Sequence, residues 1–141
     1  MGELLQRLSD GTRSGVYSAS HAEDILDATR ESDLLVSRID LAGVVEKEAL
    51  FDRIAAALRF PEWFGRNWDA LLDCLRDLSW SNSRRHVLIV ENVKGLSAED
   101  RGDLIDVLAE AASNWRTKED SFFAVFIGAA PDLPPLDHEM Q

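Results

Sequence analysis

The stretch HVLIVE, residues 86–91, is the clearest strand in the chain. Its run of branched aliphatic residues is typical of a strand that is buried within a sheet. Three other stretches have the same character: LLVSRIDL at residues 34–41, which predicts a second buried strand, FFAVFI at residues 122–127, and a shorter candidate at residues 16–18. The sequence therefore predicts three strands, or four if residues 16–18 pair with the rest.

Helical patterns separate these strands. Ser20 stands three residues before Glu23, the spacing of a capping box, which predicts the start of a first helix. Residues 46–60, EKEALFDRIAAALRF, carry apolar side chains at helical spacing, and Pro61 follows where a helix should end. Each strand can thus be joined to the next by a helical crossover, as parallel strands require.

Two more helices follow. One begins near Asn67, a favoured N-cap residue, and the other begins after Ser97 and runs to about Trp115. Strands that alternate with helices are typical of a mainly parallel sheet covered by helices. The predicted fold class is therefore α/β.

The length of 141 residues suits one domain. We expect residues 15–128 to form this domain, residues 1–14 to be a loose leader, and the Pro-rich residues 129–141 to be a mobile tail. No apolar run approaches the roughly 18–20 residues that span a bilayer, and the first residues lack a signal-peptide pattern. Cys74, the only cysteine, is expected to be a small buried hydrophobe, and a cytoplasmic location is expected for the protein.

The formal net charge is −11, from 26 acidic and 15 basic residues. A field of that sign repels nucleic acid and membrane surfaces and attracts basic proteins. Many soluble proteins carry a similar negative charge simply because it keeps them in solution. The charge therefore argues against nucleic acid and membranes as partners more strongly than it identifies any particular protein partner. We expect no direct contact with nucleic acid or membrane.

The segment FPEWFGRNWDALLDCLRDL, residues 60–78, places two kinds of side chain on one helix. The wheel of that helix, at roughly 100° per residue, has an apolar arc that should face the core: Trp68, Leu71, Leu75 and Leu78. The other arc carries Asp69 and Asp73 one turn apart, with Arg76 beside them. Leu72 lies on the border between the two arcs.

The loop before this helix adds two aromatic residues, Trp63 and Phe64, and a glycine. Gly65 can adopt positive φ at little steric cost, which suits a tight turn. An aromatic anchor beside fixed negative charge suits docking into a basic cleft. Plainer interpretations stay open, because Asp69 and Asp73 can be ordinary capping and solvated charges, and loop aromatics can fold inward.

An enzyme that uses paired carboxylates is a rival interpretation, with Asp69 acting beside Asp73 or Glu62. The sequence offers no Gly-rich phosphate loop at the end of a predicted strand. Its three histidines show no metal-ligand spacing: His21, His86 and His138. We therefore expect no enzyme activity, no cofactor, no metal and no small-molecule substrate.

The run PEWFGRNWDALLDCL, residues 61–75, closely resembles the signature of the barstar family of ribonuclease inhibitors. In that family the pattern is Pro-Glu-aromatic-aromatic-Gly, one variable residue, Asn, one variable residue, Asp-Ala-Leu, one variable residue, and Asp-Cys-Leu. The downstream strand, helix and strand are also similar, so the resemblance covers about residues 34–128. It implies a barstar-like sheet of three parallel strands packed by helices, to which the preceding residues can add a strand and a helix.

The resemblance also implies a mechanism, in which the acidic helix enters the active site of a ribonuclease. Asp73 matches the central aspartate that stands in for RNA phosphate, and Asp69 matches the second inhibitory aspartate. Trp63 matches the aromatic residue that packs against the catalytic histidine of the ribonuclease. The remaining partner-binding positions are Asn67, Phe64 and Gly65 of the binding loop, Leu72 and Arg76 of the helix, and the peripheral Glu110 of the long helix.

Three positions differ from the type member of the family. Leu72 stands where the type member has a contacting tryptophan, Arg76 replaces a small polar contact, and Arg66 replaces an acidic residue. A basic residue on the docking face is repelled by a strongly cationic cleft. The expected partner is a basic bacterial ribonuclease, barnase-like or toxin-type, in a one-to-one complex. The alternative is an acidic binding module, an adaptor or regulator whose target is not a nuclease.

Overall fold

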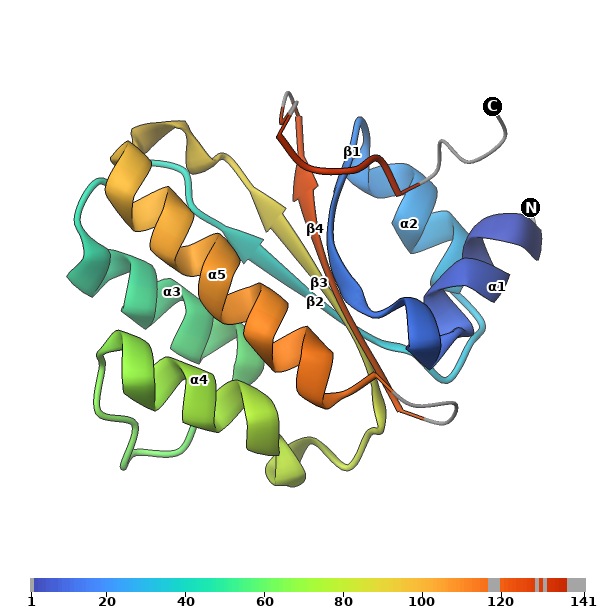
Figure 1. The fold of residues 1–141 in the computed structure, drawn as a ribbon, viewed down its shortest axis with the longest axis horizontal. Helices are drawn as coiled ribbons and strands as arrows, with labels where there is room; N and C mark the ends of the chain where they lie inside the picture. Colours follow the sequence, from blue (N-terminus) through green and yellow to red (C-terminus); the bar gives the residue numbers. More distant parts are fainter. Residues whose placement is uncertain (1, 117–119, 129, 131, 137–141) are drawn as a thin grey trace.

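The computed structural model describes residues 2–116, 120–128, 130 and 132–136, and it contains a four-stranded parallel sheet (Figure 1). The strand order is β1-β4-β3-β2, with every neighbouring pair parallel. The strands are β1 Gly15–Ala19, β2 Leu35–Asp40, β3 Arg85–Glu91 and β4 Ser121–Ile127. The predicted α/β class is confirmed, and the fourth strand forms.

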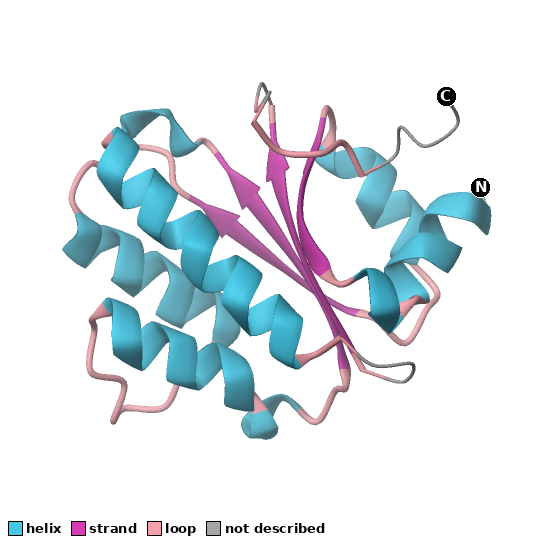
Figure 2. Ribbon diagram, viewed as in Figure 1, coloured by secondary structure: helices cyan, strands magenta, loops and turns pink. Residues whose placement is uncertain are grey.

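In the described part of the chain, five α-helices cover the two faces of this sheet (Figure 2). Three of them lie on one face: α3 Lys47–Leu58, α4 Trp68–Asp77 and α5 Ala98–Asn114. The other face is covered by α1 Gly2–Ser9 and α2 Ala22–Thr29. Short 3₁₀ turns lie at Gly11–Arg13, Ser79–Ser81 and Val93–Gly95. Within the described ranges, no helix combines the length and the apolar character that crossing a membrane requires.

The two central strands, β3 and β4, bury side chains on both faces, because successive residues of a strand point to opposite sides. On β3, Leu88 and Val90 enter the core beneath α3, α4 and α5, whereas Val87 and Ile89 face α1 and α2. The three phenylalanines of β4 divide in the same way, with Phe122 and Phe126 on the first side and Phe123 on the second. The molecule therefore has two apolar cores, one on each side of the sheet.

Two local predictions are wrong. The strand expected over residues 34–41 forms as β2, but it is an edge strand paired only with β3, so Leu35 remains 38% exposed and Ile39 alone is buried within it. The capping box at Ser20 does not form, since the N-cap of α2 is His21 and its side chain makes no capping hydrogen bond.

The ends of the chain are also more ordered than the sequence suggested. Residues 2–13, predicted as part of a loose leader, form α1 and a 3₁₀ turn, and Leu8 is completely buried. In the predicted tail, the Leu136 amide donates to the Ser18 carbonyl at 2.8 Å, and the Leu136 side chain is completely buried. The buried side chains of Leu8 and Leu136 hold the N-terminal and C-terminal segments against the sheet. The last part of the predicted tail, residues 137–141, lies outside the described residues.

The buried position of Leu8 gives a test of the docked N-terminal helix. Replacing Leu8 with alanine should lower the free energy of unfolding by about 2–5 kcal/mol, because it removes buried methyl groups and leaves a cavity. Chemical denaturation measures this change, with Gln6→Ala on the exposed side of α1 as the matched control. Equal stability of the two variants would show that α1 does not pack on the sheet.

Candidate functional site

Helix α4 is held in place at both ends. Asn67 has an extended backbone, and its Oδ1 atom accepts a hydrogen bond from the Ala70 amide at 2.7 Å, which confirms the predicted N-cap. At the other end, Leu78 adopts a left-handed conformation, with φ of 45°, and its amide donates to the Cys74 carbonyl at 3.0 Å. A helix that is capped at both ends has an ordered backbone, which fixes the direction in which each side chain leaves the helix.

The inner face of α4 is the apolar arc that the sequence predicted. Its buried members are Leu71, Cys74, Leu75 and, just past the last turn, Leu78. Trp68 is half-buried and packs edge-on against Phe51 of α3, with ring centroids 5.0 Å apart. Burial raises the pKa of the Cys74 thiol, and the charges of Asp73 and Asp77 raise it further. Cys74 is thus a buried hydrophobe, as expected, and is not poised as a reactive thiolate.

The outer face of α4 carries the two aspartates. Asp69 and Asp73 are both exposed, and neither forms an ion pair with any side chain in the described part of the chain. Leu72 is half-buried at the border of the apolar core, which matches its predicted place on the wheel. Two exposed carboxylates therefore stand on this helix without forming an ion pair with a described side chain.

Arg76 lies on the same face but is engaged by α5. Its Nη2 atom lies 2.9 Å from Oε2 of Glu110, and both side chains are exposed. This ion pair joins α4 to α5 along the side of the aspartates and offsets the charge of Arg76. The sequence placed both residues in the candidate site but did not predict that they pair with each other.

The turn before α4 differs in one detail from the prediction. Positive φ occurs at Arg66, with φ of 57°, and not at Gly65. The guanidinium of Arg66 pairs with Asp52 of α3 at 2.7 Å, which ties the turn to that helix. A Cβ atom added at Gly65 would lie 3.3 Å from that of Ala70, so glycine serves here for close approach of the loop to the helix.

The two loop aromatics point in different directions. Phe64 is buried and packs edge-on against Phe60, with ring centroids 4.9 Å apart, so it supports the loop from within. Trp63 is 64% exposed, the largest exposed aromatic among the described residues. Its ring contacts Trp80, a half-buried residue beyond the end of α4 that the sequence pattern did not mark as a site residue. The sequence feature that could have drawn attention to Trp80 was its place as an isolated aromatic residue between Ser79 and Ser81.

We name the exposed surface formed by these residues the α4 face. Its members are Asp69, Leu72, Asp73 and Arg76 of α4, Trp63 and Asn67 of the preceding loop, and Glu110 of α5. Phe64 and Gly65 lie in the same loop, as part of its support. The predicted site residues therefore come together on one side of the molecule.

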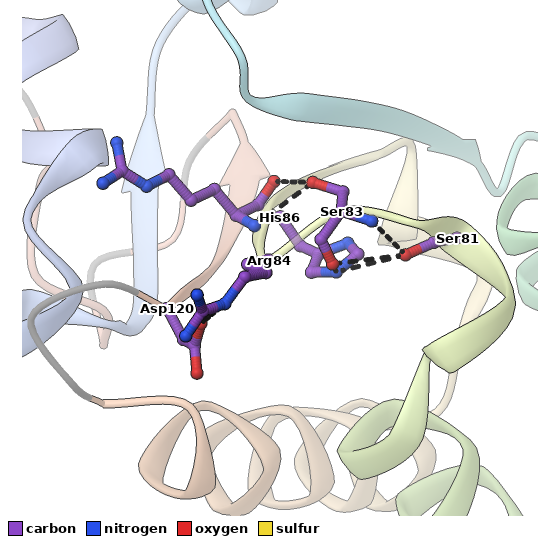
Figure 3. Close-up of polar contacts among 6 residues, drawn as sticks. Ser81, Ser83, Arg84, His86 and Asp120 are labelled. Atoms are coloured by element: carbon purple, nitrogen blue, oxygen red, sulfur yellow. Dashed lines mark hydrogen bonds and ion pairs between the residues drawn. The ribbon is translucent and has the colours of Figure 1, made fainter.

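A second polar cluster lies at the start of β3, around His86 (Figure 3). The imidazole is buried, and its Nε2 atom lies 3.1 Å from the Ser83 carbonyl oxygen and 3.5 Å from the Ser81 hydroxyl. The nearby carboxylate of Asp120 accepts a hydrogen bond from Nε of Arg84 at 2.6 Å. The His86 contacts with Ser81 and Ser83 hold the turn that leads into β3.

The described residues contain no candidate metal centre. Over residues 2–116, 120–128, 130 and 132–136, no group of three or more His, Cys, Asp or Glu side chains is arranged to hold a metal ion. The carboxylates of Asp69 and Asp73 stand on an exposed helix face. Acid-base chemistry instead requires two groups held in a pocket with separated pKa values.

The burial of His86 predicts a pH dependence of stability. Burial lowers the pKa of His86 below its ordinary value of 6.5, against the opposing effects of the Ser83 hydrogen bond and the Asp120 charge. The unfolded chain then binds the proton more readily than the folded chain, so His86 favours folding above pH 6.5. This contribution should fall as the pH drops below that value.

Urea unfolding of the wild type and of His86→Gln between pH 7.5 and 5.5 would measure this effect. The wild type should lose more stability over this range than the variant. His21→Gln, at an exposed position, controls for the loss of one histidine. Parallel pH profiles for the wild type and His86→Gln would show that the imidazole is not buried in its neutral form.

A family model described as barstar (barnase inhibitor) matches residues 34–127. No curated protein matches the chain. The match contains β2, β3, β4, α3, α4 and α5, and therefore the whole α4 face, whereas β1, α1 and α2 precede it. With about two thirds of its residues matched, and with a parallel sheet packed by helices, the chain belongs to the barstar (barnase inhibitor) family.

Proposed function

We propose that this protein binds a bacterial ribonuclease and inhibits it by placing the α4 face in the active site. The observation that carries the proposal is the pair of exposed carboxylates, Asp69 and Asp73, on a helix fixed at both ends. The family description as a barnase inhibitor supports a ribonuclease as the class of partner. The complex is proposed to be one-to-one and to form in the cytoplasm.

The chemistry of the partner explains why carboxylates suit this task. A ribonuclease active site presents cationic side chains that hold the phosphate of RNA. A carboxylate can accept charge-assisted hydrogen bonds from the same donors, and such bonds are about twice as strong as neutral ones. Because α4 is already ordered, the backbone that carries Asp69 and Asp73 loses little conformational freedom on binding. In this proposal Asp73 occupies the phosphate position, and Asp69 contacts a second cationic group.

Neighbouring residues shape the rest of the interface. Trp63, in the loop that leads into α4, offers an exposed apolar ring, which suits the anchor of a docking surface. The Oδ1 atom of Asn67 is occupied by the cap of α4, so its main part is to hold the helix start in place. Glu110 adds negative charge at the edge, and the net charge of −11 speeds encounter with a basic protein.

Arg76 bears on the identity of the target. Its charge lies beside Asp73 on the α4 face, where a uniformly cationic cleft would repel it. The ion pair with Glu110 reduces that repulsion without removing the guanidinium from the surface. We therefore propose a basic ribonuclease whose cleft tolerates this pair, and not barnase in particular. The alternative, an adaptor whose target is not a nuclease, would use the same face but would leave every ribonuclease active.

Replacement of Asp73 tests the proposed phosphate mimic. Asp73→Ala should weaken inhibition by about 2–5 kcal/mol of binding free energy, the range for removing one partner of a buried charge pair. The measurement is a titration of RNA cleavage by a panel of basic bacterial ribonucleases. Thermal unfolding should change little, because the Asp73 side chain is exposed.

Asp24→Ala is the matched control, since it removes an exposed acidic charge from α2, on the other side of the sheet. It should inhibit as the wild type does. If Asp73→Ala also inhibits as well as the wild type, the role given to Asp73 is wrong. If the wild type inhibits no ribonuclease of the panel, the target is not of the proposed class.

The Arg76–Glu110 pair predicts opposite effects on the rate of association. Arg76→Gln removes a positive charge from the α4 face and should speed association with a basic ribonuclease, whereas Glu110→Gln should slow it. Each change should be about fivefold or less at low salt, the size of one charge interaction of about 1 kcal/mol in water. Stopped-flow mixing at low and high salt would measure both rates.

Arg30→Gln on α2 provides the control, because Arg30 also forms an exposed ion pair, with Asp27, far from the α4 face. It changes the net charge by the same amount as Arg76→Gln. Equal acceleration by the two variants would mean that only total charge matters, and that Arg76 does not lie in the interface.

A further inference from the structure

Trp80 connects the exposed ring of Trp63 to the body of the protein. The two rings meet edge-to-face, with centroids 6.3 Å apart and planes at 86°. Trp80 belongs to the 3₁₀ turn Ser79–Ser81 that follows α4, whereas Trp63 belongs to the loop that precedes α4. The contact therefore links the two segments that flank the helix bearing Asp69 and Asp73.

Trp80 is itself fixed by two further contacts. Its indole Nε1 donates a hydrogen bond to the Leu58 carbonyl, in the last turn of α3, at 3.1 Å. Its ring packs edge-on against Phe60, with centroids 5.8 Å apart. Phe60 in turn packs against the buried Phe64. A continuous set of aromatic contacts thus leads from the exposed Trp63 through Trp80 and Phe60 into the core.

The backbone around Trp80 adds to this restraint. Leu78 and Asn82, on either side of the 3₁₀ turn, both adopt left-handed conformations, with φ of 45° and 61°. Leu78 is buried, so the chain leaves α4 in a direction fixed by the core. The position of the Trp80 ring against Trp63 is therefore set by the backbone of this turn.

We propose that Trp80 is a positioning residue for partner binding, which holds Trp63 in the orientation that the ribonuclease meets. This inference rests on the proposed function, and it adds a residue outside the α4 face as defined above. An exposed tryptophan without such support would sample several rotamers and would lose that freedom on binding. Trp80 restricts Trp63 before the partner arrives, which lowers the entropic cost of the complex.

The first test needs no partner. The ¹⁵N relaxation of the Trp63 indole should report a restrained side chain in the wild type and a mobile one in Trp80→Leu. Trp80→Phe should give an intermediate result, because a smaller ring keeps part of the edge-to-face contact, and it also serves if Trp80→Leu fails to fold. Ile25→Val, which destabilises the core on the other side of the sheet, should leave Trp63 restrained. An unchanged Trp63 signal in both Trp80 variants would overturn the proposal.

The second test is a double-mutant cycle with a ribonuclease that the wild type inhibits. Trp80→Phe should weaken inhibition measurably but by less than roughly tenfold, the upper effect of losing a whole aromatic pair. In a Trp63→Ala background, the same substitution should have no further effect, since Trp80 acts through Trp63. Equal weakening in both backgrounds would mean that Trp80 contacts the partner itself, which overturns the positioning role.

The two tests separate the inference from the proposed function. If the wild type inhibits no ribonuclease, the proposed function fails, while the relaxation of the Trp63 indole still decides whether Trp80 restrains it. If inhibition occurs and Trp80→Phe has no effect on it in either background, the proposed function stands and the positioning role fails.

Discussion

Double burial of β3 and β4 is the constraint on which the rest of the structure depends. Phe122 and Phe126 enter one core and Phe123 enters the other, so each face of the sheet needs its own helical cover. The part of the chain that the family model matches supplies α3, α4 and α5, which cover one face. Residues before the match supply α1 and α2, which cover the other face. They also supply β1, which pairs with β4. The N-terminal segment is therefore a structural part of this molecule.

The same packing explains how an acidic helix can serve as a rigid binding surface. The side chains of Leu71 and Leu75, on the inner face of α4, are completely buried. The Asn67 cap fixes the first turn of the helix. Burial of the inner face thus supplies most of the free energy that holds the helix, and the exposed side chain of Asp73 on the outer face is not needed for the packing of the helix. Because the inner residues hold the fold, substitutions at outer residues such as Arg76 can change which protein is bound without changing the fold.

The sequence could predict features that depend on local pattern. The wheel of α4 separated Leu71 from Asp73 correctly because helical periodicity alone determines which side faces the core. It could not show that residues 34–41 form an edge strand, because strand order depends on contacts distant in the sequence. For the same reason it missed the anchoring of Leu8, the Arg76–Glu110 pair and the contact of Trp80 with Trp63. Each of these contacts joins residues from different elements, and the chemistry of one residue does not reveal which distant residue it will contact.

The central claim is that the α4 face occupies the phosphate site of a ribonuclease, and competition measures this most directly. The inhibition constant of the wild-type protein would be determined with rising concentrations of a mononucleotide that binds the ribonuclease active site. If the carboxylates of Asp69 and Asp73 take the place of phosphate, the nucleotide and the protein should exclude each other, and apparent affinity should fall in proportion to nucleotide occupancy. An affinity that stays constant as the active site fills with nucleotide would contradict the account.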